Sequence, residues 1–271
     1  MYISENGLDW SSFLSNQPMS NLYFSHSLWW SSLGSGGYGK LGVSQDGKEW
    51  HNATNYPVIS RVLVDSSDFF YVVAMSPEQQ KAKVLRSKTG YSWDEAGALT
   101  IKGVSNAQLS SFAAYGHGMF VMHISYFDYS RNTSRTALIN SPMPGLNYSM
   151  ITQFSSYDNI YPHSLSFDAR TELFLLAVDN CLFLSQDSVS WNKIQIGPLS
   201  TSIVAFEIAA SSAAAVLSSG EVLMSDPGYT MWRVVWQVPE LRAYPTVLLV
   251  YMDSDDEWAL LAPQGSVYVS K

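Results

Sequence analysis

Short apolar runs recur along the chain, each bounded by Gly, Asp, Asn or Ser, as is typical of β-strands. No window of useful length keeps the 3.6-residue apolar period of an amphipathic helix, so we expect few helices. The runs come in groups of three. The first runs lie at 22–24, 61–65, 109–115, 164–168, 203–208 and 247–253. The second runs lie at 27–30, 69–75, 119–124, 173–178, 213–217 and 258–262, and the third runs at 41–43, 83–85, 136–139, 182–184, 222–224 and 267–269.

A short turn sequence follows the third run of most groups and leads to a Trp or Tyr. Its copies are SENGLDW from Ser4, SQDGKEW from Ser44, SKTGYSW from Ser87, SPMPGLNY from Ser141, SQDSVSW from Ser185 and SDPGYTMW from Ser225. By subtraction of those positions, successive Ser residues are 40, 43, 54, 44 and 40 residues apart. This spacing is the length of one four-stranded propeller blade.

The residues of these turns have physical roles that suit a tight hairpin. The side chains of Asn6, Asp46 and Asp187 can accept hydrogen bonds from nearby backbone N–H groups. Glycines supply the left-handed backbone that such a turn demands, and we expect this of Gly7, Gly47, Gly90, Gly145 and Gly228. The aromatic residue begins the next strand and can wedge between adjacent blades; it is Trp10, Trp50, Trp93, Trp191 or Trp232.

The pattern predicts an all-β fold, a six-bladed β-propeller of four-stranded antiparallel blades with these hairpins between the third and fourth strands. Residues 1–271 are expected to form a single domain. Residues 1–3 repeat the third run, so the N-terminal and C-terminal strands would share one blade and close the ring. One third-strand copy is then surplus, and which copy closes the ring stays open.

The turn copies resemble the Asp-box, or BNR, repeat of a β-propeller family. That family includes sialidases, sortilin-type receptors, photosystem II assembly factors and many bacteriophage tail or virion proteins. The short form SQDGKEW looks most like the phage and assembly-factor versions. The resemblance implies that the Ser, Asp and Trp of each box are scaffold on one rim of the propeller, away from the binding face.

Composition narrows the choice of partner and compartment. The net charge of −8 argues against a nucleic-acid partner, because phosphate binding needs a basic face. No apolar stretch reaches the length of a membrane helix, and the first ten residues lack the basic and apolar regions of a signal peptide. We therefore expect a location in a virion, reached through the host cytoplasm, or in the cytoplasm. The single cysteine, Cys181, is expected to be a small core residue.

No catalytic constellation emerges from the residues, so we expect a non-enzymatic protein without a cofactor. A sialidase-like site needs three arginines, a Tyr–Glu pair and an acidic Asp, and the nearest match to its Arg-Ile-Pro pattern is Ile59-Ser60-Arg61. The segment Gly34–Lys40 nearly matches a phosphate-binding loop, but Leu41 stands where Ser or Thr is required. The acidic run Asp253–Glu257 is expected to be a solvated turn rather than a Ca²⁺ loop. Metal-ligand spacing is missing from His26, His51, His117, His123 and His163.

Two long connections offer a candidate binding site. Residues 125–135 join a second and a third strand, and residues 149–163 lead to the next blade, so both belong to the face opposite the boxes. Aromatic faces beside planar polar groups suit carbohydrate and protein recognition. The candidate binding residues are Tyr126, Asp128, Tyr129, Arg131, Asn132, Tyr157, Asp158, Asn159 and Tyr161.

The favoured function is a non-enzymatic interaction or structural module, a component of a bacteriophage tail or virion. Its partner would be a protein of the same assembly or a surface glycan of the host. Two alternatives stay open, a sialidase-like carbohydrate-active enzyme and a bacterial assembly or adhesion factor. All three interpretations rest on analogy at the level of the fold.

Overall fold

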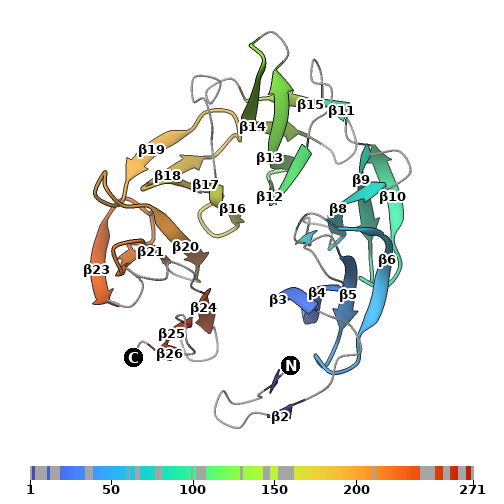
Figure 1. The fold of residues 1–271 in the computed structure, drawn as a ribbon, viewed down its shortest axis with the longest axis horizontal. Helices are drawn as coiled ribbons and strands as arrows, with labels where there is room; N and C mark the ends of the chain where they lie inside the picture. The colour runs from blue at the N-terminus through green and yellow to red at the C-terminus, as the bar shows by residue number, and fades with distance from the viewer. Residues whose placement is uncertain are drawn as a thin grey trace. The chain divides into compact units, whose positions relative to one another are not determined.

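The structure is a computed structural model in which every described element is a β-strand or a connection between strands (Figure 1). It describes residues 2–3, 11–12, 19–33, 39–58, 60, 62–64, 68–76, 81–98, 100–101, 108–128, 131–142, 147–151, 162–209, 212–238, 248–252, 257–261 and 267–269. Two compact units divide the chain. One comprises Met1–Ala113 and Ser141–Ser149, and the other Ala114–Asn140 and Met150–Lys271.

Antiparallel sheets follow one another along the chain, each built from consecutive strands. The first sheet holds β3 (Met19–Ser25), β4 (Leu28–Leu33), β5 (Lys40–Ser44) and β6 (His51–Pro57). The second holds β7 (Leu63–Val64), β8 (Phe70–Ser76), β9 (Lys81–Ser87) and β10 (Asp94–Ala98). The third holds β12 (Gln108–Gly116), β13 (Met119–Asp128), β14 (Thr133–Ser141) and β15 (Asn147–Met150), with β11 (Thr100–Ile101) parallel to β15 at its edge.

The remaining sheets continue the same order. The fourth sheet holds β16 (Pro162–Asp168), β17 (Leu173–Val178), β18 (Cys181–Ser185) and β19 (Asn192–Gln195). The fifth holds β20 (Ile203–Ile208), β21 (Ala213–Leu217), β22 (Glu221–Ser225) and β23 (Trp232–Gln237). The sixth has three described strands, β24 (Leu248–Met252), β25 (Glu257–Leu261) and β26 (Val267–Val269). A separate pair joins β1 (Tyr2–Ile3) to β2 (Ser11–Ser12).

Middle strands such as β18 and β21 are largely apolar because both of their faces are covered. Every residue of β18 and of β21 is buried. Outer strands differ: every residue of β19 and β23 is exposed or half-buried. This gradient explains why the second and third runs of each group are recognisable in the sequence and the fourth strands are not.

Apolar clusters between neighbouring sheets form the core of each unit. Within the first unit, Trp30 and Val43 of the first sheet pack with Val72 of the second. Within the second unit, Leu175 and Leu182 of the fourth sheet share a cluster with Phe206, Ala215 and Leu217 of the fifth. A further cluster joins the fifth and sixth sheets through Val216, Trp258 and Leu260. Sheets therefore stack face to face within each unit, as blades of a propeller do.

The strand predictions are confirmed in most particulars. The runs predicted at 173–178, 203–208, 213–217 and 267–269 coincide with β17, β20, β21 and β26. Among the described residues there is no helix, as the missing 3.6-residue period indicates. Cys181 is buried in β18, as predicted for a core residue. Lys40 begins a β-strand rather than a helix, so the near match to a phosphate-binding loop lacks the element that such a loop requires.

Candidate functional site

The structure describes part of the predicted binding site. Tyr126 and Asp128 lie on β13, and Arg131 and Asn132 form the turn that follows. Tyr129 lies outside the described residues. So do the candidates of the second long connection, Tyr157, Asp158, Asn159 and Tyr161.

The connection predicted at 125–135 is mostly strand. β13 extends to Asp128 and β14 begins at Thr133, so the turn between them is short. The prediction of a long loop is wrong here because Tyr126, Phe127 and Thr133 are strand-forming residues, whereas the polar character of the segment suggested a loop. The result is a long hairpin, whose strands of 10 and 9 residues are visible in green in Figure 1.

Polar contacts hold the tip of this hairpin. The backbone N–H of Arg131 donates to the carbonyl oxygen of Asp128 at 3.2 Å. Asn132 takes a left-handed φ of 51°, which Asn tolerates better than most residues. The Asp128 carboxylate lies 3.9 Å from Nε of Arg131 and 3.9 Å from Nη1 of Arg135. One carboxylate thus lies between two guanidinium groups at the end of the hairpin.

The two arginines differ in their access to a partner. The side chain of Arg135 is 11% exposed, whereas that of Arg131 is 62% exposed. Arg135 and Asp128 therefore belong to the framework of the hairpin, and Arg131 presents its guanidinium to solvent. A guanidinium in this position can form a forked pair with a carboxylate or stack on a flat ring.

At the other end of the strands, the described box turns share one geometry. The Asp side chain of a box accepts backbone N–H groups further along its own turn, at 2.8 and 2.9 Å for Asp46 and at 2.8 and 2.7 Å for Asp187. These N–H donors hold the pKa of Asp46 below its ordinary value and lower that of Asp187 to about 2. The predicted Asx turn is confirmed at both residues.

Each of these turns also has one residue in the left-handed region, and the indole N–H of the box Trp donates to its carbonyl. The donor–acceptor distances are 2.9 Å for Trp50, 2.9 Å for Trp93, 3.2 Å for Trp191 and 3.0 Å for Trp232. We call this residue the left-handed position of the box. It is Gly47, Gly90, Ser188 or Tyr229, with φ values of 72°, 81°, 63° and 62°.

The prediction for Gly228 is wrong, because the left-handed residue of that box is Tyr229. The box from Ser225 contains one residue more than SQDGKEW, so its turn reaches the left-handed position one residue later. Asp226 compensates by accepting from the N–H groups of Thr230 and Met231, at 2.7 and 3.0 Å. Gly47 and Gly90 take the predicted conformation, whereas Gly7 and Gly145 lie outside the described residues.

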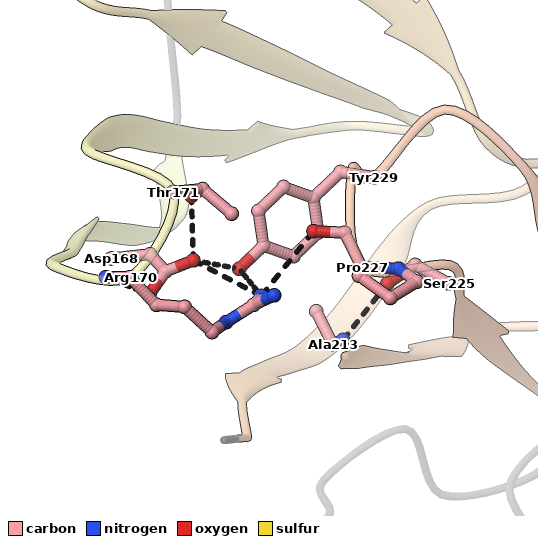
Figure 2. Close-up of polar contacts among 7 residues, drawn as sticks. All are labelled: Asp168, Arg170, Thr171, Ala213, Ser225, Pro227 and Tyr229. Atoms are coloured by element: carbon pink, nitrogen blue, oxygen red, sulfur yellow. Dashed lines mark hydrogen bonds and ion pairs between the residues drawn. The ribbon is translucent and has the colours of Figure 1, made fainter. Parts of the chain in front are cut away.

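The side chain of Tyr229 enters a polar cluster, shown in Figure 2, in which Tyr229 and Asp168 are buried and Arg170 is exposed. Its hydroxyl donates to Oδ2 of Asp168, at the end of β16, at 2.6 Å. Thr171 donates to the same oxygen at 2.6 Å, and Nη2 of Arg170 lies 3.2 Å from it. The same guanidinium nitrogen donates to the Tyr229 hydroxyl at 3.2 Å and to the carbonyl oxygen of Pro227 at 3.3 Å. The cluster joins the β16–β17 turn of the fourth sheet to the box of the fifth.

The electrostatics of the cluster favour an ionised Asp168 and a neutral Tyr229. Burial alone would raise the pKa of Asp168, but the hydrogen bonds from Thr171, Tyr229 and the Arg170 backbone, with the Arg170 charge, hold it below the ordinary value. Burial, followed by the hydrogen bond to Asp168, raises the pKa of Tyr229. A nucleophilic Tyr needs a lowered pKa or an adjacent base with spare capacity. Tyr229 has the opposite shift, and its neighbouring carboxylate is already shared.

Sequence reasoning missed Asp168, Arg170 and Tyr229 as a group. The extra residue in SDPGYTMW marks this box as unusual, but it gives no sign that Tyr229 reaches a residue 61 positions earlier. Within the described part of the chain, no group of three or more His, Cys, Asp or Glu side chains could hold a metal ion. The described residues include no helix long and apolar enough to cross a membrane.

The stacked four-stranded antiparallel sheets define an all-β fold of the propeller-like class. No family model matches the chain, and no curated protein matches it in sequence. Among solved structures, YCF48 bound to D1 peptide is similar with a TM-score of 0.58 and 13% identity, over 98% of this chain and 84% of that one. Puromycin hydrolase complexed with PGG is similar with a TM-score of 0.66 and 10% identity, over 94% of this chain and 45% of that one.

A third similar structure is the extracellular domain of the hybrid two component system BT4673 from B. thetaiotaomicron. Its TM-score is 0.56 and its identity 9%, over 92% of this chain. The chain spans 32% of the length of that protein and 45% of the length of puromycin hydrolase. At these identities the likeness concerns the fold, and the named proteins differ in what they do.

Proposed function

We propose that this protein is a non-enzymatic interaction module, a propeller of Asp-box repeats that contacts a partner through the tip of the β13–β14 hairpin. The observation that carries the proposal is the length of this hairpin. Its strands have 10 and 9 residues, against 6 and 5 for β17 and β18 and 5 each for β21 and β22. The β13–β14 hairpin is therefore longer than the β17–β18 and β21–β22 hairpins need to be to form stacked sheets.

The chemistry at the tip supports recognition. Arg131 is exposed while the Asp128–Arg135 pair lies behind it, so the contact group is carried on an ordered support. A binding residue on a rigid element loses less conformational freedom when it meets its partner. Tyr126 lies on β13 close to the hairpin turn, and it adds a half-buried aromatic side chain to the end of the hairpin that carries Arg131.

The proposal includes six blades. The sixth sheet has three described strands, and the β1–β2 pair brackets the box from Ser4, which has the third-strand and fourth-strand pattern. Pairing of this hairpin with the sixth sheet would give the outer strand that the other sheets have. The ring would then be closed by the two ends of the chain.

We place the module in a bacteriophage tail or virion, where it would bind a protein of the same assembly or a glycan of the host surface. The short box form supports this setting through its resemblance to phage propellers. A similar fold is compatible with peptide binding, since YCF48 is bound to D1 peptide in its structure.

Substitution of the exposed arginine tests the proposal. Arg131→Ala should weaken binding about tenfold or more if Arg131 is a hot-spot residue, and Tyr126→Ala should weaken it in the same direction. The matched control is Arg233→Ala, which removes an exposed arginine from the outer strand β23. Binding would be measured against a glycan array and against the purified products of the neighbouring genes, and folding by circular dichroism.

The outcomes separate the alternatives. Loss of binding with Arg131→Ala and not with Arg233→Ala supports the hairpin site. Equal effects of the two variants would move the contact surface away from the hairpin. Turnover of a sialoside by the wild-type protein would overturn the non-enzymatic interpretation.

A further inference from the structure

Tyr229 occupies a backbone conformation that is unfavourable for it. The left-handed position is held by glycine in two described boxes, at Gly47 and Gly90, and a side chain with a Cβ meets steric resistance there. A bulky residue such as tyrosine is rare in this region unless the surroundings determine it. The contacts of the Tyr229 side chain must therefore offset the backbone strain.

Those contacts reach the preceding sheet. The Tyr229 side chain is fully buried, and its hydroxyl donates to the carboxylate of Asp168, where β16 of the fourth sheet ends (Figure 2). Arg170 bridges the two residues, because its Nη2 forms an ion pair with Asp168 and donates to the Tyr229 hydroxyl. Arg170 further donates to the Pro227 carbonyl in the same box. The hydrogen bonds from Tyr229 to Asp168 and from Arg170 to Tyr229 and Pro227 join the β16–β17 turn to the box of the next sheet.

The left-handed positions of two other boxes also contact the sheet before them, but by different means. Ser188 accepts a buried hydrogen bond from the side-chain amide of Asn140, on β14 of the third sheet, at 3.1 Å. Gly90 faces Trp30 of the first sheet so closely that a Cβ would lie 2.7 Å from the ring atom Cη2. Each left-handed residue thus suits the side chain that faces it. The Tyr229 hydroxyl donates to the Asp168 carboxylate, the Ser188 hydroxyl accepts from the Asn140 amide, and Gly90 leaves room for the Trp30 ring.

From these matched contacts we infer that the left-handed position fixes the second, fourth and fifth sheets each to the sheet before it, and that Tyr229, Asp168 and Arg170 form a latch between the fourth and fifth sheets. The latch is chemically distinct from the Asn140–Ser188 and Trp30–Gly90 contacts. A chain of similar sheets can stack in a wrong order or with another copy, as repeat proteins do when they misassemble. Contacts that differ from one pair of sheets to the next favour one order.

Single and double substitutions test the latch. Tyr229→Phe keeps the ring and the backbone conformation and removes only the hydroxyl, and Asp168→Asn removes the charge. Each should raise the unfolding equilibrium constant about tenfold or more, because a buried hydrogen bond to a charged group is lost. The double variant should raise it by far less than the product of the two single effects, because both substitutions remove the same interaction. Urea unfolding of the purified full chain supplies the constants.

Two further variants serve as a control and as a removal of the whole side chain. Tyr91→Phe removes a hydroxyl from the exposed side of another box and should change the constant by less than about twofold. Tyr229→Gly relieves the strained backbone but removes a fully buried ring, so it should destabilise the protein more than Tyr229→Phe; a Tyr229→Gly variant as stable as Tyr229→Phe would show that the ring adds nothing to the latch.

Hydrogen exchange of backbone amides gives an independent readout. In Tyr229→Phe, exchange should become faster at the Arg170 amide in the fourth sheet as well as in the box of the fifth, because the latch joins both. Faster exchange confined to the box would overturn the latch. So would a Tyr229→Phe variant as stable as Tyr91→Phe, or single effects that multiply in the double variant.

Discussion

At the scale of the residue, the neighbours of a left-handed glycine decide whether a larger residue can replace it. Gly90 and Gly118 both have positive φ, at 81° and 71°. A Cβ on Gly90 would collide with the Trp30 ring, whereas a Cβ on Gly118 would meet nothing within 4 Å. Substitution of Gly118 by alanine therefore measures backbone strain alone, whereas substitution of Gly90 measures backbone strain together with a steric clash.

We predict that Gly118→Ala lowers the free energy of unfolding by about 1–2 kcal/mol, the cost of a left-handed alanine. Gly90→Ala should lower it by at least about 1 kcal/mol more, because Trp30 is fully buried and must move. Chemical denaturation of both variants against the wild type measures the difference. Equal losses of unfolding free energy in the two variants would mean that the Trp30 ring can move aside without destabilising the protein.

At the scale of the element, the box Trp links a turn to the strand that follows it. The four described copies donate an indole N–H within their own turn, but they differ in burial. Trp191 is 4% exposed and lies 6.4 Å from the Phe174 ring, whereas Trp50 is half-buried. Trp93 contacts Trp30 of the preceding sheet, with ring centroids 6.3 Å apart, as the predicted wedge between blades requires.

Trp191→Ala should therefore cost about 3–5 kcal/mol of unfolding free energy, as truncation of a buried aromatic residue does. Trp50→Ala should cost less, because part of its ring already faces water. Asp46→Ala, which removes hydrogen bonds at an exposed turn, should cost about 1 kcal/mol. Denaturant melts rank the three variants; a Trp50→Ala loss as large as that of Trp191→Ala would contradict the link between burial and stability.

The elements were the part of the structure most open to prediction. Continuous apolar runs such as 173–178 and 213–217 are bounded by turn residues and are too short for a typical helix, so the local pattern favours β17 and β21 as buried strands. The end of β13 does not, because Tyr126 and Asp128 suit both a polar loop and an exposed strand. The Asp168–Tyr229 contact depends on how two sheets stack, which no local pattern encodes.

At the scale of the whole molecule, the proposed ring depends on its first residues. If the β1–β2 hairpin completes the sixth sheet, deletion of residues 1–10 leaves an unpaired strand edge and exposes part of a core. We predict a lower melting temperature and a tendency to associate for that truncation, measured by calorimetry and by size-exclusion chromatography with light scattering. Terminal segments are often dispensable, and an unchanged melting temperature with a monomeric profile would reject closure through these residues.

The two ends of the β14 strand differ in how much sequence change the fold tolerates. Its first residue, Thr133, is exposed beside the hairpin tip, and its last residues, Asn140 and Ser141, are buried at the box end, where Asn140 donates a hydrogen bond to Ser188. Substitutions at Thr133 carry little penalty in folding, since exposed substitutions change stability by about 0.5 kcal/mol or less. The surface at one end of the strand can therefore be redesigned, whereas the other end is constrained by its contact with the next sheet.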